Sequence, residues 1–255
     1  DVIFQGESGM ISITGDPKDG PRKTATTIGD YVAGTNMALA VAAALAEQSR
    51  QGRRIDVSLR DGIMAVQSGW NALGFANHRQ PERTGTASPF LAPNQVFEAA
   101  DGSFTLAVVS DRHFELLCDA IERADLAETF PTNEERMKGR DSLSRKLSRL
   151  FKTEPVEYWI EVLEEAGVPV GRVLTIPEAF DDPQARHHEM LVEFEHPVAG
   201  HVRTTGSPLR VDSRQARSER LPPVLGEHTR QILHEMGVDG ETIEKMVEEG
   251  RAVAP

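Results

Sequence analysis

The sequence is poor in three features that would direct it to particular partners or compartments. It has one cysteine, Cys118, so it can form no internal disulfide, which is typical of proteins from a reducing compartment. Its 28 basic residues are outnumbered by 40 acidic ones, and the net charge of -12 leaves no basic excess to neutralise nucleic acid phosphates. The longest apolar run, residues 37–46, is too short and too rich in alanine to span a bilayer. We therefore expect a cytoplasmic protein that binds neither nucleic acid nor membrane.

Several common catalytic motifs are also missing from the sequence. It contains no G-x-S-x-G nucleophile elbow, no Walker A loop and no G-x-G-x-x-G fingerprint. Four histidines lie close together, but neither a thiolate nor the spacing of a helix-face pair accompanies them, so we expect no metal site. These are His187, His188, His196 and His201. Cys118 has the spacing of a helical core residue and is predicted to be a packed thiol.

The first third of the chain has the pattern of a layered α/β domain. Hydrophobic residues make up 39% and charged residues 27% of the 255 residues, which is ordinary for a globular protein. Strands are predicted at 1–4 and 54–59, and helices at 29–49 and 61–75. Alternation of strand and helix is typical of a parallel sheet covered by helices.

The pattern changes after residue 77. Residues 77–95 are rich in Pro, Arg, Thr and Asn and are predicted to be a linker and a loop. Two strand-like runs then flank Asp101-Gly102, which predicts a β-hairpin over 95–109. We expect a smaller α+β domain over 81–150, inserted between residues 1–80 and 151–255 of one larger α/β body. Further helices are expected near 111–122, 134–151, 153–166 (capped by Thr153), 177–189 (broken at Pro183), 227–236 and 240–249, and strands at 168–174, 191–196 and 201–205.

Asp30 is the first candidate for chemistry. It follows Thr27-Ile28-Gly29 at the start of the long apolar helix, where a carboxylate lies at the positive end of the helix dipole. An ionised aspartate that reaches a bound carbonyl can act as a nucleophile and form a covalent intermediate. Thr27 and Asp30 also have the spacing of a capping box, which is a purely structural role. The stretch alone leaves both interpretations open.

A set of short segments extends over essentially the whole chain. They are Gln5-Gly6-Glu7-Ser8-Gly9, Gly29-Asp30-x-x-Ala33-Gly34, Gly52-Arg53 with Ile55-Asp56-Val57-Ser58-Leu59, Phe97-x-x-x-Asp101-Gly102, Phe114-x-x-Leu117-Cys118, Ala166-Gly167-Val168-Pro169-x-Gly171, Asp182-Pro183-Gln184, and Pro222-Pro223-x-Leu225-Gly226-Glu227-His228-Thr229. In this order they resemble the family III CoA-transferases, a superfamily that includes formyl-CoA and carnitine CoA-transferases and the α-methylacyl-CoA racemases. Members of that family are longer at the amino end. The resemblance therefore implies a truncated chain, the C-terminal portion of a layered parallel-sheet body, in which most CoA contacts are absent.

The resemblance also implies a reaction and a site. The family's nucleophilic aspartate falls on Asp30, and its glycine-rich active-site loop falls at about 88–94, which here reads Ser-Pro-Phe-Leu-Ala-Pro-Asn without a glycine run. Gly29, Pro93 and Asn94 are the expected substrate-contacting residues, and backbone amides near Gly29 or in 88–94 are the expected oxyanion donors. CoA would move from an acyl-CoA to a carboxylic acid through an aspartyl anhydride and an aspartyl-CoA thioester. No permanent cofactor is implied, and the expected assembly is an interlocked homodimer.

Two other functions remain open from the sequence. An α-methylacyl-CoA racemase would move the α-proton between an aspartate and a histidine, and the family's histidine would fall just before residue 1. Alternatively, the chain is a non-catalytic fragment that only packs against its missing half. The identities of the acyl donor and the acceptor do not follow from the sequence.

Overall fold

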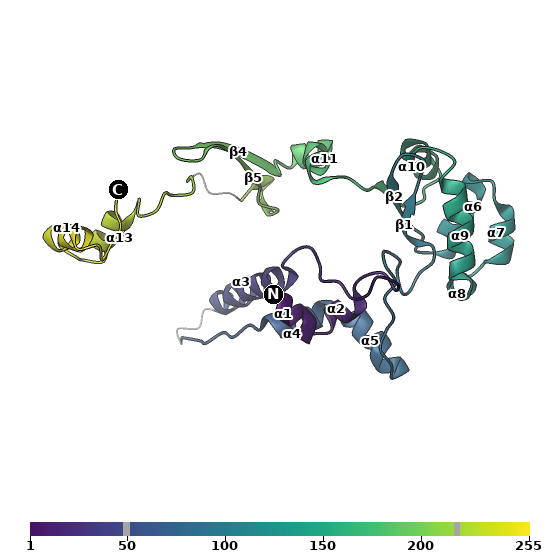
Figure 1. The fold of residues 1–255 in the computed structure, drawn as a ribbon, viewed down its shortest axis with the longest axis horizontal. Coiled ribbons are helices and arrows are strands. Elements are labelled where there is room, and N and C mark those ends of the chain that lie inside the picture. Colours follow the sequence, from purple (N-terminus) through teal and green to yellow (C-terminus); the bar gives the residue numbers. More distant parts are fainter. Residues whose placement is uncertain (48–51, 217–219) are drawn as a thin grey trace. The chain divides into compact units, whose positions relative to one another are not determined.

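The computed structural model describes residues 1–47, 52–216 and 220–255 (Figure 1). The chain divides into two compact units, Asp1–Val173 and Leu174–Pro255. The first unit contains a group of amino-terminal helices and a small α+β body, and the described residues of the second contain two strand hairpins and two helix pairs.

The amino-terminal group consists of helices around α4, which packs against α1 and α3. Its members are α1 (Val2–Glu7), α2 (Met10–Ile13), α3 (Ile28–Ala46), α4 (Leu59–Val66) and α5 (Ser68–Asn77). The contact between α3 and α4 is close because both helices present a glycine there. A Cβ on Gly62 would lie 2.9 Å from Val32 Cγ1, and one on Gly29 would lie 2.8 Å from Ile63 Cδ1.

Two strands predicted in this region are wrong. Residues 2–7 form α1, in which the Gln5 amide donates to the Asp1 carbonyl over 2.9 Å, so the backbone bonds locally. Residues 52–58 belong to no helix or strand. An extended segment becomes part of a sheet only when a neighbouring strand accepts its backbone hydrogen bonds, and no described residue does so for 52–58. Short apolar runs cannot distinguish these outcomes.

The helix predicted over 61–75 is divided into α4 and α5 at Gln67. The side chain of Gln67 turns away from the helices and donates its Nε2 to the Ser8 carbonyl over 2.5 Å. Ser58 caps the first of the two helices, since its hydroxyl accepts from the Asp61 amide over 3.2 Å. The division at Gln67 therefore anchors α4 and α5 to the turn between α1 and α2.

The small α+β body is built on an antiparallel sheet with the order β1-β2-β3. Strands β1 (Asn94–Glu98) and β2 (Ser103–Ala107) form the predicted hairpin, with Phe97 opposite Phe104. Strand β3 (Val170–Arg172) pairs with β2, and Thr105 faces Gly171. Five helices complete this body: α6 (Asp111–Ala120), α7 (Ala124–Thr129), α8 (Asn133–Lys138), α9 (Arg140–Phe151) and α10 (Val156–Glu165).

The core of this body is centred on Phe151. Its ring meets those of Phe97, Phe104 and Trp159 edge to face, with centroids 5.0–5.1 Å apart. The indole Nε1 of Trp159 also donates to the Phe151 carbonyl over 2.7 Å. Edge-to-face pairs of this kind add to the free energy of burial, so the sheet, α9 and α10 are held together at one point.

The small body extends past the predicted boundary at residue 150. Trp159 and Leu163 of α10 lie in the same core cluster as Phe97, and β3 completes the sheet. The sequence signals for this division are the change of composition at 77–95 and the hairpin pattern that follows, and neither shows that a later strand returns to the first hairpin. Whether residues 1–80 and the carboxy-terminal residues form one larger body stays a prediction.

Two helix boundaries in this body differ from those predicted. The helix expected over 134–151 is divided at Gly139, where a Cβ would lie 2.4 Å from Phe130 Cε1. The helix expected from 153 begins at Val156, and Thr153 does not cap it. Thr153 instead donates to the Leu150 carbonyl over 2.7 Å, and the Asp101 carboxylate in the hairpin turn accepts from the Val156 amide over 2.8 Å.

The second unit consists of short elements paired with their neighbours in sequence. Helices α11 and α12 are separated by the predicted break at Pro183. Strands β4 and β5 form an antiparallel hairpin in which Phe194 faces Val202. The elements are α11 (Ile176–Asp181), α12 (Pro183–His187), β4 (Leu191–His196), β5 (Gly200–Thr205), β6 (Arg210–Val211), β7 (Arg214–Gln215), α13 (Thr229–Glu235) and α14 (Gly240–Glu248).

The structure therefore mixes helices with short strands. Within the ranges that the structure describes, each paired strand is antiparallel to its neighbour, so these residues do not form the expected parallel sheet.

Helix α3 is apolar and almost wholly uncovered. Among its residues only Gly29 and Ala33 are buried, while Tyr31, Leu39 and Leu45 are 70%, 68% and 75% exposed. By length and composition it could cross a membrane, because the helix is longer than the apolar run 37–46 within it. The core helix of a soluble protein meets the same criterion. The apolar surface of α3 is therefore suited to contact either another protein surface or a membrane.

Candidate active site

Asp30 is the third residue of α3 and lies exposed in its first turn. In the part of the chain that the structure describes, no group donates a hydrogen bond to its carboxylate. The Thr27 side chain makes no capping bond, so the capping box with Asp30 does not form. The purely structural interpretation of Asp30 thus loses its main support, and the carboxylate is free to meet a ligand.

Asp1 performs the capping that was expected of Thr27. Its Oδ1 accepts from the Gly29 amide over 2.8 Å, which satisfies one of the free N–H groups at the start of α3. Its Oδ2 accepts from Gln5 Nε2 over 2.6 Å, and Gln5 Oε1 in turn accepts from the Thr24 amide over 3.0 Å. Asp1 and the fully buried Gln5 therefore fix the loop that leads to Asp30.

Gly29 is packed rather than open to a substrate. It is buried, and an added Cβ would lie 3.0 Å from Asp1 Oδ1 as well as close to Ile63. The Gly29 amide already donates to Asp1, so an oxyanion donor would have to be another amide near Gly29 or one in 88–94, and that expectation stays a prediction. Gly29 positions Asp30 by allowing α3 to begin close to α4.

The 88–94 segment, defined as residues Ser88 to Asn94, runs irregularly into β1. Its two ends are joined, since the Ser88 amide donates to the Asn94 carbonyl over 2.8 Å. The Ser88 hydroxyl accepts from the amides of Phe90 and Leu91 over 3.1 and 3.3 Å. The segment is therefore a closed turn and not a flexible glycine-type loop.

Pro93 and Asn94 lie at the end of this segment. The Ala92–Pro93 peptide bond is cis, and the buried Pro93 accepts from the Val108 amide through its carbonyl over 2.9 Å. Asn94 is half-buried and begins β1 opposite Ala107. Both residues are fixed by the sheet.

Small cavities lie along α3 and near the 88–94 segment. A hollow of about 280 Å³ is lined by four residues of α3, including Tyr31, and by Val66 of α4. Another of about 240 Å³ is lined by Pro89 of the 88–94 segment and by Arg140, among others. Asp30 lines neither of these two cavities.

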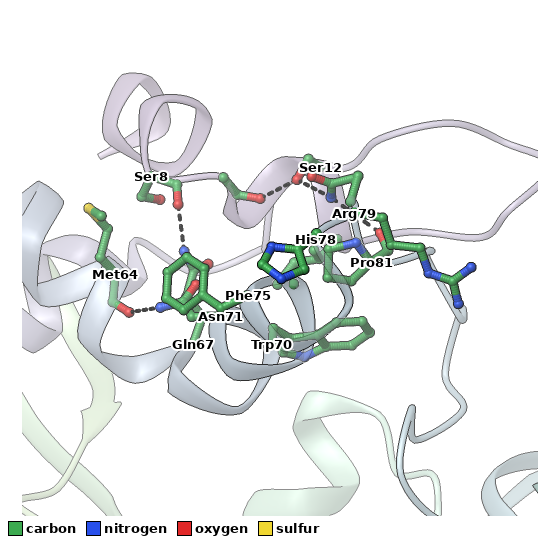
Figure 2. A pocket seen from close by; sticks show the side chains of 14 residues that line it. Ser8, Ser12, Met64, Gln67, Trp70, Asn71, Phe75, His78, Arg79 and Pro81 are labelled. Atoms are coloured by element: carbon green, nitrogen blue, oxygen red, sulfur yellow. Dashed lines mark hydrogen bonds between the residues drawn. The ribbon is translucent and has the colours of Figure 1, made fainter.

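A third cavity, of about 520 Å³, lies along α4 and α5 (Figure 2). Trp70 and Phe75 contribute aromatic rings to it, and His78 and Arg79 lie at the end of α5. In Figure 2, Gln67 reaches across to Ser8. No local pattern in the sequence predicts this cavity, because its walls come from segments more than fifty residues apart.

The cysteine and two of the histidines considered from the sequence contact neighbouring protein groups. Cys118 is fully buried in the core, which confirms the packed thiol, and this burial raises its pKa to about 12, with smaller contributions from Asp119 and Asp125. His196 contacts the Pro222 carbonyl, and His201 contacts Glu195. Within the described ranges, no three His, Cys, Asp or Glu residues are grouped so as to hold a metal ion.

The comparison with protein families identifies the chain. The model of CoA-transferase family III matches residues 1–229, a range that includes Asp30 and the 88–94 segment. The chain belongs to CoA-transferase family III.

Curated relatives of this family member are CoA-transferases. It is 31% identical over 245 residues to the succinyl-CoA:mesaconate CoA-transferase of Haloarcula marismortui, covering 95% of this chain and 62% of the relative. It is 35% identical over 230 residues to the acetyl-CoA:oxalate CoA-transferase of Acetobacter aceti, covering 86% and 57%. The human succinyl-CoA:glutarate CoA-transferase is 28% identical over 240 residues, covering 92% and 55%. The chain thus spans between 55% and 62% of the length of these relatives.

Solved structures support the same assignment. A CAIB/BAIF family protein from Brucella suis superposes with a TM-score of 0.77 at 28% identity, covering 92% of this chain and 62% of that one. A protein from Mycobacterium tuberculosis superposes with a TM-score of 0.74 at 23% identity, covering 89% and 62%, and shows a shared fold alone.

Proposed function

We propose that this family III chain carries the nucleophile of a CoA-transferase that moves CoA from an acyl-CoA to a carboxylic acid. The family match over residues 1–229 is the observation that carries the proposal. The exposed Asp30 carboxylate at the start of α3 agrees with it, because a nucleophile must be able to reach the carbonyl of a bound substrate.

The reaction proceeds through two covalent intermediates on Asp30. The carboxylate attacks the thioester carbonyl, the C–S bond breaks, and a mixed anhydride and CoA thiolate form. The thiolate attacks the aspartyl carbonyl, which releases the donor acid and leaves an aspartyl-CoA thioester. The acceptor carboxylate then attacks that thioester, giving a second anhydride and the thiolate. Attack of the thiolate on the acyl carbonyl yields the new acyl-CoA and restores Asp30.

The structure suggests how the protein assists these steps. Carboxylates are weak nucleophiles, so holding Asp30 in one orientation supplies much of the rate, and Asp1 and Gln5 fix the loop before it. Both intermediates hydrolyse in water, so the site must exclude it. We assign that role to the 88–94 segment, with Pro93 and Asn94 near the substrate.

Small dicarboxylic acids are the acceptors that we propose. Mesaconate, oxalate and glutarate appear in the names of the relatives, and succinyl-CoA or acetyl-CoA are their named donors. CoA enters as a substrate, and no permanent cofactor takes part in the steps above.

The fold and assembly of the whole protein are also proposals. We propose that, in a protein of the relatives' length, residues 52–58 pair with strands that the described residues do not supply, and that α3 packs on the resulting layered parallel sheet. The apolar face of α3 would then be covered by protein and not by a membrane. We further propose a cytoplasmic, interlocked homodimer.

The test is an assay of CoA transfer by the intact protein. Succinyl-CoA or acetyl-CoA is offered with mesaconate, oxalate or glutarate, and product acyl-CoA is measured for wild type, Asp30→Asn and Asp61→Asn. Asp61 is the matched control, since it occupies the same position in the first turn of α4. Asp30→Asn should lower transfer by about three orders of magnitude or more and change the free energy of unfolding by less than about 1 kcal/mol.

Two outcomes would contradict this function. Transfer retained in Asp30→Asn would remove Asp30 from the mechanism. Exchange of the α-hydrogen of a 2-methylacyl-CoA without any transfer would favour the racemase, and neither activity in the intact protein would favour a non-catalytic role.

A further inference from the structure

Three side chains from α8 and α9 hold the backbone of the 88–94 segment. They are Asn133, Arg136 and Arg140, whose spacing places them on one side of these consecutive helices. Each bonds to the main chain of the segment and not to its side chains. These contacts therefore hold the backbone of the segment from outside, in addition to the bonds that the Ser88 hydroxyl accepts within it.

Asn133 makes a reciprocal pair of hydrogen bonds. Its Nδ2 donates to the Phe90 carbonyl over 3.0 Å, and its Oδ1 accepts from the Ala92 amide over 3.2 Å. One carboxamide thus bridges two peptide groups, in the way that a neighbouring strand would. Loss of this side chain leaves both backbone groups without those partners.

Arg136 and Arg140 bind the carbonyls on either side of this pair. Arg136 is 1% exposed and donates Nε to the Ala92 carbonyl over 2.7 Å, while its Nη2 pairs with Asp111 over 2.6 Å. Its guanidinium also lies over the Phe114 ring, 4.6 Å from the centroid. Arg140 donates to the Ser88 carbonyl.

Helix α5 supports the opposite side of the segment. The Phe90 ring lies against Trp70, with centroids 6.4 Å apart, and a Cβ on Gly69 would be 3.5 Å from Phe90 Cζ. The segment is therefore held both by polar contacts from α8 and α9 and by aromatic packing on α5.

We propose that Asn133 is a positioning residue, which with Arg136 and Arg140 holds the 88–94 segment as a fixed shield over the covalent intermediates. This inference rests on the proposed CoA transfer. The segment has no glycine run, so its shape comes from these side chains and not from backbone freedom. If it loosens, water reaches the aspartyl-CoA thioester, the C–S bond breaks, and Asp30 carboxylate and free CoA thiol are released without transfer.

The ratio of acyl-CoA hydrolysis to CoA transfer measures this shield. We compare Asn133→Ala, which removes both bonds, and Asn133→Asp, which keeps an acceptor for the Ala92 amide, with the control Lys138→Gln. Lys138 lies on α8 and forms an exposed ion pair with Glu134. Asn133→Ala should raise the ratio by roughly tenfold, with Asn133→Asp intermediate and Lys138→Gln unchanged. Hydrogen exchange at the amides of 90–92 should be fastest in Asn133→Ala, intermediate in Asn133→Asp and unchanged in Lys138→Gln.

The outcomes separate this inference from the proposed function. A variant that merely unfolds in part lowers transfer and hydrolysis together and leaves their ratio unmoved, so an unchanged ratio in both Asn133 variants overturns the shield. An unchanged rate of hydrogen exchange at the amides of 90–92 in both Asn133 variants would show that Asn133 does not hold the segment. A wild type that neither transfers nor hydrolyses acyl-CoA contradicts the proposed function instead.

Discussion

Two acidic residues at the start of α3 have different surroundings. Asp1 is bound by the Gly29 amide and by Gln5, whereas Asp30 has no donor among the described residues. The sequence pointed to Asp30 because of its position at a helix start, but it gave no sign of Asp1, whose partner lies 28 residues away. Capping rules consider only residues next to the helix start in sequence, so they cannot predict a capping residue that belongs to another element.

The thiol of Cys118 should be unreactive in the folded protein. Burial raises the pKa of Cys118 from 9.0 to about 12, so the thiol stays protonated and inaccessible at pH 8. We expect no labelling by iodoacetamide at pH 8 without denaturant and complete labelling in urea, as followed by mass spectrometry. Rapid labelling of the folded chain would show that the core of the small body is open.

The same shift makes stability depend on pH at the alkaline end. The folded pKa lies above the unfolded one, so the contribution is fully present below pH 9.0 and is lost as pH rises toward about 12, because the unfolded thiol ionises first. The decrease in unfolding free energy over this window should be smaller in Cys118→Ala. An equal decrease in both proteins would contradict the shift.

Elements with local signals were predicted well, and elements that need distant partners were not. The hairpin β1–β2 follows from Asp101-Gly102, and the break at Pro183 follows from proline chemistry. Residues 1–4 and 54–59 were predicted as strands, but a strand depends on a neighbour that no local pattern supplies. The breaks at Gln67 and Gly139 likewise come from contacts with Ser8 and Phe130.

Two glycines of α3 should respond to alanine with opposite signs. Gly29→Ala places a Cβ 2.8 Å from Ile63 Cδ1, which is fully buried, so we expect a loss of about 1–3 kcal/mol. Gly34→Ala meets nothing within 4 Å and should stabilise this chain by about 0.5–1 kcal/mol through helix propensity. Urea denaturation of the 255-residue chain tests both. Equal effects would show that α3 does not begin against α4 as described.

At the scale of the whole molecule, the exposed apolar surface of α3 is the feature of the candidate site that most needs a partner. Tyr31 follows Asp30 directly, and Leu39 and Leu45 continue the apolar surface away from it. Large apolar surfaces of soluble proteins are generally covered by another protein surface. The sequence predicted association from the family resemblance, but which surface is covered could be recognised only from the exposure of these side chains.

This surface should drive association of the chain. Light scattering at micromolar concentration should show a dimer or a larger species for wild type. Leu39→Glu combined with Leu45→Glu should shift it toward monomer, because each substitution places a charge on the exposed apolar surface of α3. Val198→Glu is the control, since Val198 is 78% exposed in the second unit, on the turn of the β4–β5 hairpin. A stable wild-type monomer would contradict the account.

Trapping of the covalent intermediate tests the central claim most directly. The intact protein is incubated with succinyl-CoA, treated with hydroxylamine, digested and analysed by mass spectrometry. An activated aspartyl carbonyl reacts with hydroxylamine, so the peptide containing Asp30 should carry a hydroxamate in wild type and none in Asp30→Asn. Absence of the hydroxamate from wild type, together with α-hydrogen exchange of a 2-methylacyl-CoA in deuterated water, would contradict the transferase mechanism and favour the racemase.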